Sequence, residues 1–478
     1  ATLAFTWVSP DGSSIRNQML YPTYMGGNRL GWSYPYDRNH EWALMEDMIK
    51  TLNAKEKSQR YIIMCGGDFS PPPQSLADLA RDWNANHTDS KLIVAAAADF
   101  FKADTAAMKS APKIINTEFQ VGWNGFLSNV IEDKLLNRAA ENLLRQGEAL
   151  HTWAKAYGAE YPHEDFERNW IYIIENTFHD EGAGSVYDPG REDLVKRQAA
   201  AMPAIRKLVS DGTAFFASGI DTAAGAPAGA QSALVLFNTL SFKRDAVAEL
   251  DNTFSGDFRI ADAAGNEITY QLVDGKIVFI AALPSMGWKT YYILPGKSAA
   301  FSPVEKEEPV AAGGTVTLRG PRGSFSVTLD EKADITSLTA GAARKELVAH
   351  GSLLNELCMQ PDEGTDYDYA PHASKEFLEM RGRTCTGTGF EFKAVVRKGP
   401  VLTRLVSSGK TGASDVTRDV RVYSSLNRID NIVSVDWKDE QHDLYTVFRY
   451  AGAGARTDSI PLGYIRRTAD GRFPIVGW

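Results

Sequence analysis

The hydrophobic pattern of the chain changes twice, and these changes limit its possible folds more than any single motif does. Up to about residue 105, segments with helical spacing alternate with short apolar runs. From about Ile131 to Val209, apolar residues recur at helical spacing throughout. After the Ala- and Gly-rich loop Ala223–Gly229, the pattern alternates between apolar and polar residues with frequent turns. The sequence therefore predicts an α/β region, a helical region and a β region in that order.

Two continuous apolar runs in the first region, Arg60–Cys65 and Leu92–Ala97, are typical of strands buried on both faces of a parallel sheet. Helical spacing predicts helices over His40–Leu52 and around residues 76–83. This strand–helix–strand order implies right-handed crossovers. Asp99 follows the second run, and we expect it to be a helix N-cap.

The helical region predicts three helices with short links, which is the pattern of a small bundle. The second helix is expected to start near Glu164 and to end in the stretch that contains His179. Its apolar stripe should face a core and consists of Phe166, Trp170, Ile173, Ile174 and Phe178. Asp188-Pro189 supplies an N-cap and an N1 proline for the third helix, and Pro203 should kink that helix or mark its near end.

The β region contains many short alternating segments separated by turn residues, as expected for β-sandwiches. The stretch Ser302–Gly314, with its glutamates and prolines, resembles a linker between two β-domains. The predicted organisation is multidomain α/β plus β. We expect an α/β domain over residues 1–110 and a three-helix bundle over residues 111–213. A small β-domain is expected over residues 214–300 and a large β-sandwich domain over residues 301–478.

The net charge of −9, without any basic run, argues against nucleic acid or an anionic membrane as the main partner. No stretch reaches the roughly 18 apolar residues of a membrane span. The start of the chain lacks an initiator Met and the charged region of a signal peptide, and so carries no evidence on localisation. Low cysteine use favours a bacterial cytoplasmic protein. The sequence does not decide whether the protein forms a homo-oligomer.

The three cysteines, Cys65, Cys358 and Cys385, lie far apart and show no Cys-x-x-Cys spacing. This argues against a disulfide framework and against a thiolate zinc site. The sequence also lacks a Gly-x-Ser-x-Gly elbow and a glycine-rich phosphate loop after a strand. A serine hydrolase triad and a nucleotide cofactor are therefore not predicted.

Asp68 is the carboxylate of the first region that is best placed for chemistry. It follows the run Arg60–Cys65 directly after two glycines, and the carboxyl ends of parallel strands are where α/β folds place their sites. The alternative is an ordinary turn aspartate. Tyr34, Tyr36 and Asp37 could line a polar aromatic wall, and we take Tyr36 as a candidate substrate contact.

His179 and Asp180 lie off the apolar stripe of the second bundle helix and are followed by glycines. They could direct one imidazole and one carboxylate into a cleft. The alternative is a solvated last turn with a glycine cap. A zinc-type metal needs three or more such donors, and neither His151 nor His163 has a useful spacing to His179.

Seven short motifs occur in order along the chain. They are Trp7 through Asp11-Gly12-Ser13, Gly67-Asp68-Phe69, the Asn-Arg…Glu pattern in Leu136–Leu144, Phe178-His179-Asp180 followed by Gly184-Ser185, Leu236–Ser241, Leu283–Trp288 and Val435–Glu440. In order and spacing they resemble glycoside hydrolase family 38, the α-mannosidases.

The resemblance implies the end of a parallel α/β barrel-like catalytic domain, a three-helix bundle that contributes to the active site, and β-sandwich domains. It also implies retaining hydrolysis of an α-mannoside substrate at a site with one divalent metal, usually zinc. By position in the motifs, Asp68 would be the general acid/base and His179 a metal ligand. Asp180 would contact the sugar in the metal-bearing subsite.

Three features depart from the family pattern. The family's His-x-Asp metal-ligand pair and its nucleophilic aspartate lie in an N-terminal portion that precedes the motifs found here, and its β region normally runs past Trp478. Phe126–Asn129 stands where a Tyr-Thr-Ser type segment is usual. We therefore expect at most half of a catalytic site in this chain, as part of a longer polypeptide. The alternatives are a non-catalytic relative that binds carbohydrate or serves as a scaffold, and a relative that acts on another sugar.

Overall fold

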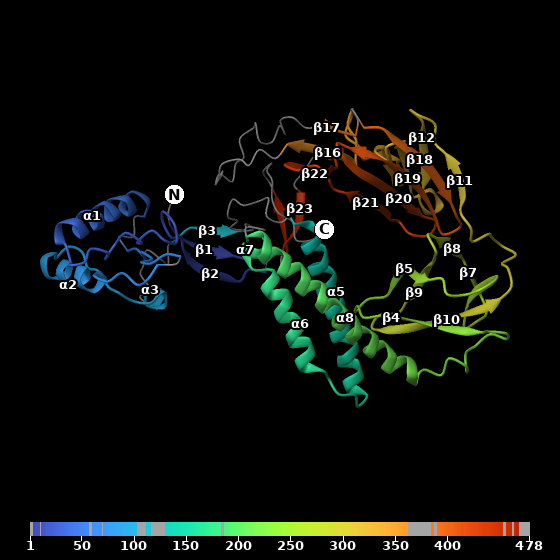
Figure 1. Cartoon of the computed structure of the whole chain (residues 1–478), viewed down its shortest axis with the longest axis horizontal. Coiled ribbons are helices and arrows are strands. Elements are labelled where there is room, and N and C mark those ends of the chain that lie inside the picture. Colours follow the sequence, from blue (N-terminus) through green and yellow to red (C-terminus); the bar gives the residue numbers. More distant parts are fainter. Residues whose placement is uncertain are drawn as a thin grey trace. The chain divides into compact units, whose positions relative to one another are not determined.

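The computed structural model describes most of the chain, in two compact units. The described residues are 3–9, 11–56, 60–68, 70–102, 111–115, 130–182, 186–361, 384–386, 390–452, 456–460 and 463–467. The first unit comprises residues 1–120, 455–470 and 475–478, and the second comprises residues 121–454 and 471–474. Figure 1 labels their helices and strands.

A small mixed sheet forms part of the first unit. Strand β1 (Ala4–Val8) pairs antiparallel with β2 (Ser14–Gln18) and parallel with β3 (Lys113–Ile115). A separate hairpin joins β23 (Arg456–Ile460) to β24 (Gly463–Arg467). One parallel pair is thus present, between β1 and β3, but it does not involve the runs for which parallel pairing was predicted.

The described part of the first unit also contains three helices: α1 (Arg38–Lys55), α2 (Leu76–Asn86) and α3 (Ala97–Lys102). Helix α1 begins where the Asp37 side chain accepts a hydrogen bond from the backbone N–H of His40. Helices α1 and α2 share a core that contains Met45, Leu79 and Trp83. Both helices were predicted from their apolar spacing, and both predictions are confirmed.

Three predictions for the first unit are wrong. Neither Arg60–Cys65 nor Leu92–Ala97 forms a strand, because no described strand pairs with either run. In the second run, Ile93 is 76% exposed and Val94 is 64% exposed. Asp99 is not an N-cap either, since α3 already begins at Ala97 and Asp99 lies in its first turn.

The three predicted bundle helices are present in the second unit. They are α5 (Ile131–Ala156), α6 (His163–Asn176) and α8 (Asp188–Gly219), with the single turn α7 (His179–Gly182) between the last two. The apolar spacing seen in the sequence builds their shared core, whose buried members are Ala140, Leu144, Phe166, Ile173, Met202, Ile205 and Leu208.

The bundle differs from the prediction at its helix ends. Helix α6 stops at Asn176, so Phe178 lies beyond it and is 51% exposed, and Ile174 is 65% exposed rather than in the core. Helix α8 begins at Asp188 itself, which is therefore not its N-cap. It also runs well past Pro203. Met202 and Ile205 beside the proline are buried in the bundle core, and this packing outweighs the one lost backbone hydrogen bond.

Two sheets build the small β-domain that follows. Their strand orders are β4-β10-β6-β7 and β5-β9-β8. Side chains from both sheets form one core, around Ile260, Phe279 and Tyr291. The strands are β4 (Ser232–Asn238), β5 (Arg244–Asp251), β6 (Phe258–Asp262), β7 (Glu267–Ile268), β8 (Tyr270–Val273), β9 (Lys276–Leu283) and β10 (Gly287–Pro295).

The large β-domain is a sandwich in which the sheet β11-β18-β19-β20-β21 faces the sheet β12-β13-β14-β15. Val327 and Leu329 of one sheet share a core with Leu405 and Val420 of the other. Its strands are β11 (Lys306–Pro309), β12 (Thr315–Arg319), β13 (Phe325–Asp330), β14 (Ile335–Ala340), β15 (Lys345–Glu346), β18 (Phe392–Lys398), β19 (Leu402–Thr411), β20 (Ser414–Tyr423) and β21 (Ile429–Asp436). The predicted linker Ser302–Gly314 contains β11, whose pairing with β18 makes it part of the sandwich.

A third sheet of this domain has the order β17-β16-β22 and contains a disulfide. Its strands are β16 (Glu356–Pro361), β17 (Thr384–Cys385) and β22 (His442–Val447). Cys358 and Cys385 are direct register partners on β16 and β17, and they form the bond. The expectation that the cysteines would not pair is wrong, because strand pairing brings together two residues that are 27 positions apart in the sequence.

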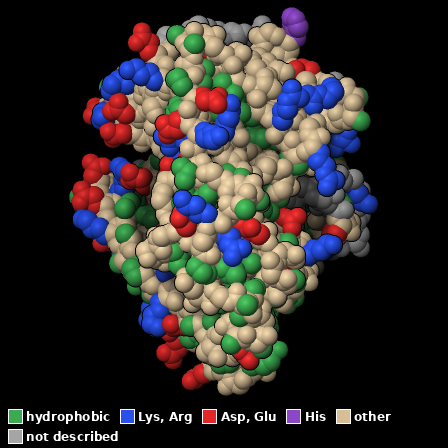
Figure 2. All heavy atoms as spheres, turned by 90° about the vertical axis from the view of Figure 1, so that its right-hand side faces the viewer, with side chains coloured by type: hydrophobic (Ala, Val, Ile, Leu, Met, Phe, Trp, Pro, Cys, Tyr) green, Lys and Arg blue, Asp and Glu red, His purple; other side chains and the backbone are tan. Residues whose placement is uncertain are grey.

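Lysine, arginine, aspartate and glutamate side chains are interspersed on the face of the molecule shown in Figure 2. Within the described residues, no helix has the length and apolar character that crossing a bilayer requires.

Candidate functional site

The predicted site residues fall into two groups. Asp68 and Tyr36 belong to the first unit, whereas His179 and Asp180 belong to the second. Some residues of the sequence motifs lie outside the described residues, namely Phe69 and Gly184-Ser185. The same holds for Phe126–Asn129, the segment that departs from the family pattern.

Asp68 lies in an exposed turn after two glycines. The hydroxyl of Tyr24 donates a hydrogen bond to its Oδ2 atom at 2.6 Å. Sequence reasoning missed Tyr24, because it lies 44 residues away and no motif contains it. A hydroxyl that donates to one carboxylate oxygen leaves the other oxygen available for a substrate, which suits a proton-transfer role.

The backbone before Asp68 packs tightly against the segment that carries Tyr24. The N–H of Gly27 donates to the carbonyl oxygen of Met64 at 2.8 Å. A Cβ atom at Gly27 would come within 2.7 Å of both Ile63 and Met64, so a glycine is required for this close approach. Gly66 has a φ of 137°, a backbone conformation that also favours glycine. Together these glycines hold the Asp68 turn against the Tyr24 segment.

Tyr36 is engaged in a polar network at the start of α1. Its hydroxyl donates to Asp82 Oδ2 at 2.8 Å, and Arg38 Nε donates to the same oxygen at 2.8 Å. Burial and the hydrogen bond to Asp82 raise the pKa of Tyr36 to about 12. The bond from Arg38 holds the pKa of Asp82 below its usual value. The Tyr36 hydroxyl thus already has an internal partner, and its role as a substrate contact stays a prediction.

His179 and Asp180 open the single turn α7 and both face solvent. Their side chains are 64% and 58% exposed, and His179 Nε2 lies 3.5 Å from Asp180 Oδ1. The ring of Phe178 lies against the imidazole, with ring centroids 4.4 Å apart. An exposed imidazole beside an exposed carboxylate can reach a metal or a ligand without any rearrangement of the core.

The far end of α7 is held by helix α5. Lys134 donates a hydrogen bond from Nζ to the carbonyl oxygen of Gly182 at 2.5 Å. Burial lowers the pKa of the Lys134 ammonium, while neighbouring Asp133 acts in the opposite direction. The sequence pattern did not single out Lys134, because a lysine in an otherwise amphipathic helix is an ordinary surface residue.

The donor types at α7 suit a zinc-type metal, but their number does not complete a site. An imidazole nitrogen and a carboxylate oxygen are normal zinc ligands, and four are usual. Among the described residues, the group of three metal-ligand side chains that lie close together is Glu356, Cys358 and Cys385. The two cysteines form the disulfide and offer no thiolates.

The other histidines near the bundle do not join His179. His151 is buried, and its Nε2 lies 2.9 Å from the carbonyl oxygen of Leu208, which is a structural contact. His163 is the exposed first residue of α6. The described residues therefore provide two donors, and any further donors must come from elsewhere.

Comparison with known proteins identifies the parts of the chain. Residues 122–216 match the model of the "Alpha mannosidase middle domain", and residues 322–474 match that of the "Glycosyl hydrolases family 38 C-terminal domain". The chain belongs to glycoside hydrolase family 38. The first match covers the bundle with His179 and Asp180, and the second covers most of the large β-domain.

Relatives of the family-38 chain agree with this assignment. Human Alpha-mannosidase 2C1 is 24% identical over 362 residues, which are 72% of this chain and 32% of that protein. The mouse protein of the same name is 25% identical over 277 residues, or 55% of this chain and 24% of that protein. The family-38 chain thus spans about a third or less of the curated relatives that it matches.

Solved structures share the fold. The crystal structure of an alpha-mannosidase from Enterococcus faecalis V583 has a TM-score of 0.74 at 15% identity, over 98% of this chain and 60% of that one. A family-38 protein from Enterococcus faecalis has a TM-score of 0.71 at 14% identity, over 97% and 60%. These likenesses confirm the mixed architecture with β-sandwich parts that the sequence predicted.

Proposed function

We propose that this chain supplies one side of the active site of a retaining α-mannosidase. The observation that carries the proposal is the pair His179 and Asp180, exposed side by side on α7 within the segment that matches the alpha-mannosidase middle domain. Asp68, in a glycine-flanked turn with one oxygen bonded to Tyr24, is the proposed general acid/base.

In this proposal Asp68 protonates the glycosidic oxygen as the bond breaks, and later removes a proton from the attacking water. Retention needs a second carboxyl group about 5–5.5 Å away as the nucleophile. We expect that group, and the remaining metal donors, from residues outside these 478, since the relatives are longer than the chain. A test is the complete open reading frame: a His-x-Asp after a strand and an aspartate in a later loop are expected upstream of Ala1.

His179 and Asp180 would hold a divalent metal and a sugar hydroxyl, respectively. When bound, the metal would hold sugar hydroxyls and help to distort the ring. His179→Ala in the polypeptide of the complete reading frame should lose bound zinc, measured by elemental analysis after dialysis. His163→Ala is the matched control, because that histidine is exposed on neighbouring α6. Equal metal content in the wild type, His179→Ala and His163→Ala would show that His179 is not a metal ligand.

The barrel-like architecture of the catalytic domain is also part of this proposal. The mixed sheet β2-β1-β3 and helices α1 and α2 would form its last part, and the remaining strands would lie outside the chain. The competing function is a non-catalytic carbohydrate-binding module. Chelator-sensitive hydrolysis of an aryl α-mannoside would separate the two, because a binding module retains sugar affinity but shows no turnover.

A further inference from the structure

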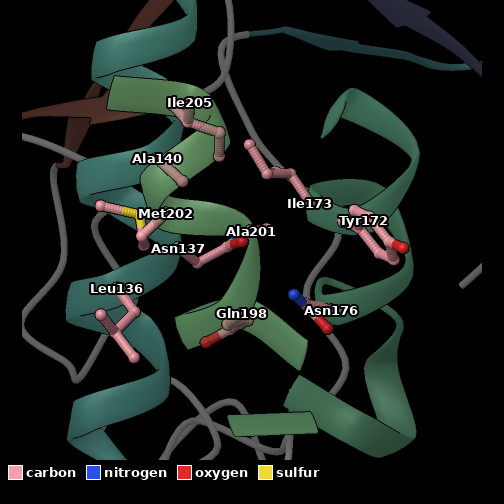
Figure 3. Close-up of a pocket in the computed structure, with 10 residues that line it drawn as sticks. All are labelled: Leu136, Asn137, Ala140, Tyr172, Ile173, Asn176, Gln198, Ala201, Met202 and Ile205. Atoms are coloured by element: carbon pink, nitrogen blue, oxygen red, sulfur yellow. The ribbon is translucent and has the colours of Figure 1, made fainter. Parts of the chain in front are cut away.

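The three long helices of the bundle line a small cavity, drawn in Figure 3. Its volume of about 10 Å³ is roughly what one water-sized sphere occupies. Helices α5, α6 and α8 all contribute to its wall. The lining residues are Leu136, Asn137, Ala140, Tyr172, Ile173, Asn176, Gln198, Ala201, Met202 and Ile205.

Three amides in this wall are buried. Asn137 is 9% exposed, Asn176 is 6% exposed and Gln198 is 5% exposed. Figure 3 shows the amides of Asn137 and Asn176 pointing toward each other across the cavity. They come from different helices, α5 and α6, and Gln198 of α8 lines the same cavity.

Several of these buried polar atoms have no partner among the described residues. They are Oδ1 of Asn137 and both Oε1 and Nε2 of Gln198. Burial raises the pKa of the Asp133 carboxyl group, and the neighbouring Gln198 side chain acts in the opposite direction, although neither of its amide atoms completes a hydrogen bond. Buried amides almost always have partners, so these atoms point to a ligand.

The chemistry of the wall selects that ligand. Asn137 Oδ1 and Gln198 Oε1 need donors, whereas Gln198 Nε2 needs an acceptor. A metal cation satisfies only oxygens and would be repelled by an amide N–H group. A water molecule donates twice and accepts twice, so it can serve both kinds of atom. The volume excludes anything larger.

We propose that this cavity is a specific water-binding site, in which one water molecule bridges Asn137 of α5 and Gln198 of α8. Asn176, the last residue of α6, is its third partner. The site goes beyond the proposed glycosidase function and does not depend on it. Asn176 lies three residues before His179, so the water ties the helix that precedes the α7 turn to both of its neighbours.

The direct test is a high-resolution crystal structure of the 478-residue chain. One density peak within hydrogen-bond distance of both Asn137 and Gln198 is expected, and it should be unchanged after a rubidium soak. A closed cavity in which the two amides bond directly to each other would overturn the proposal. An anomalous rubidium signal at the same place would overturn it as well, because the ligand would then be a cation.

Variants provide a second test that needs no crystal. Asn137→Leu removes one water partner and leaves the Gln198 amide unsatisfied, so faster backbone hydrogen exchange is expected in α5, α6 and α8. Asn142→Leu makes the same chemical change at an exposed position of α5 and should have no such effect. The double variant Asn137→Leu/Gln198→Leu removes both orphaned amides and should regain much of the protection. Unchanged or slower exchange in Asn137→Leu would contradict the bridging water.

Discussion

The Nζ atom of Lys134, on α5, donates a hydrogen bond to the carbonyl oxygen of Gly182, the last residue of α7, at 2.5 Å. It connects the bundle to the short turn that carries His179 and Asp180. Because α7 has only four residues, backbone hydrogen bonds alone give it little stability. We infer that Lys134 is a positioning residue for this turn.

Lys134→Met should loosen the turn and leave the rest of the bundle intact. Hydrogen exchange of a peptide that spans residues 177–182 should accelerate, while peptides from the middle of α5 should not change. Lys155→Met is the control, since Lys155 is exposed on the same helix. Lys134→Arg, which keeps a donor, should restore part of the protection. Equal exchange of this peptide in the wild type and Lys134→Met would refute the inference.

The disulfide predicts a simple thiol count. The chain has three cysteines, of which Cys358 and Cys385 are bonded and Cys65 is free. Protein purified without reductant and then denatured should therefore show one reactive thiol per chain, and three after reduction. Cys358→Ser should lower the free energy of unfolding by about 2–4 kcal/mol, the usual contribution of a disulfide. Three thiols in the unreduced protein would show that the bond does not form.

The ion pairs of Arg404 predict that this residue stabilises the connection between the two β-domains. It is 2% exposed and binds Asp274 at the β8–β9 turn, Glu305 before β11 and Asp419 on β20, at 2.7 to 3.0 Å. Arg404→Met would leave the largely buried Glu305 without its ion-pair partner and buried Asp419 with Arg421 alone, and breaking such a buried pair typically costs about 3–5 kcal/mol. Urea unfolding should therefore shift strongly. Lys398→Met removes an exposed pair with Glu308 and should cost only about 0–1 kcal/mol. Similar shifts in the two variants would contradict a structural role for the Arg404 network.

The raised pKa of Tyr36 predicts that the stability of the folded chain depends on pH under alkaline conditions. Its pKa in the folded chain is about 12, against a usual value of 10.0, because of burial and the hydrogen bond to Asp82. Between these values the unfolded chain loses the phenolic proton and the folded chain keeps it. The stabilising contribution is therefore complete below pH 10 and is lost as the pH rises through 12. In an ultraviolet tyrosinate titration, the difference between wild type and Tyr36→Phe should show this high midpoint. Asp82→Asn should lower the midpoint, and an unchanged midpoint would argue against the network.

The helices and strands with strong local patterns could be predicted from the sequence. Helices α1, α2 and α5, and strands such as β9 and β19, have apolar residues whose spacing is decided within one element. The runs Arg60–Cys65 and Leu92–Ala97 could not be predicted in this way. An apolar run becomes a strand only where another strand supplies hydrogen bonds, and pairing is not encoded locally.

The candidate site could be predicted only in part, for the same reason. Asp68, His179 and Asp180 stand in short motifs, so the sequence alone is enough to name them as candidates. Tyr24 and Lys134 act through contacts 44 and 48 residues away in the sequence, and the register partners Cys358 and Cys385 are 27 residues apart. Such pairs follow from packing, which a single sequence does not reveal.

The proposed acid role of Asp68 is tested most directly by the turnover of Asp68→Asn, made in the polypeptide of the complete reading frame. General acid catalysis is typically worth about 10²–10⁴-fold, so turnover of an α-mannoside with a poor leaving group should fall by that factor. The loss should be much smaller with an activated aryl leaving group, which departs without a proton. Tyr24→Phe, which removes the hydrogen bond to Oδ2 but keeps the carboxyl group, should reduce turnover less. An equal loss on both kinds of leaving group, or no loss on either, would contradict the assignment of Asp68 as the acid.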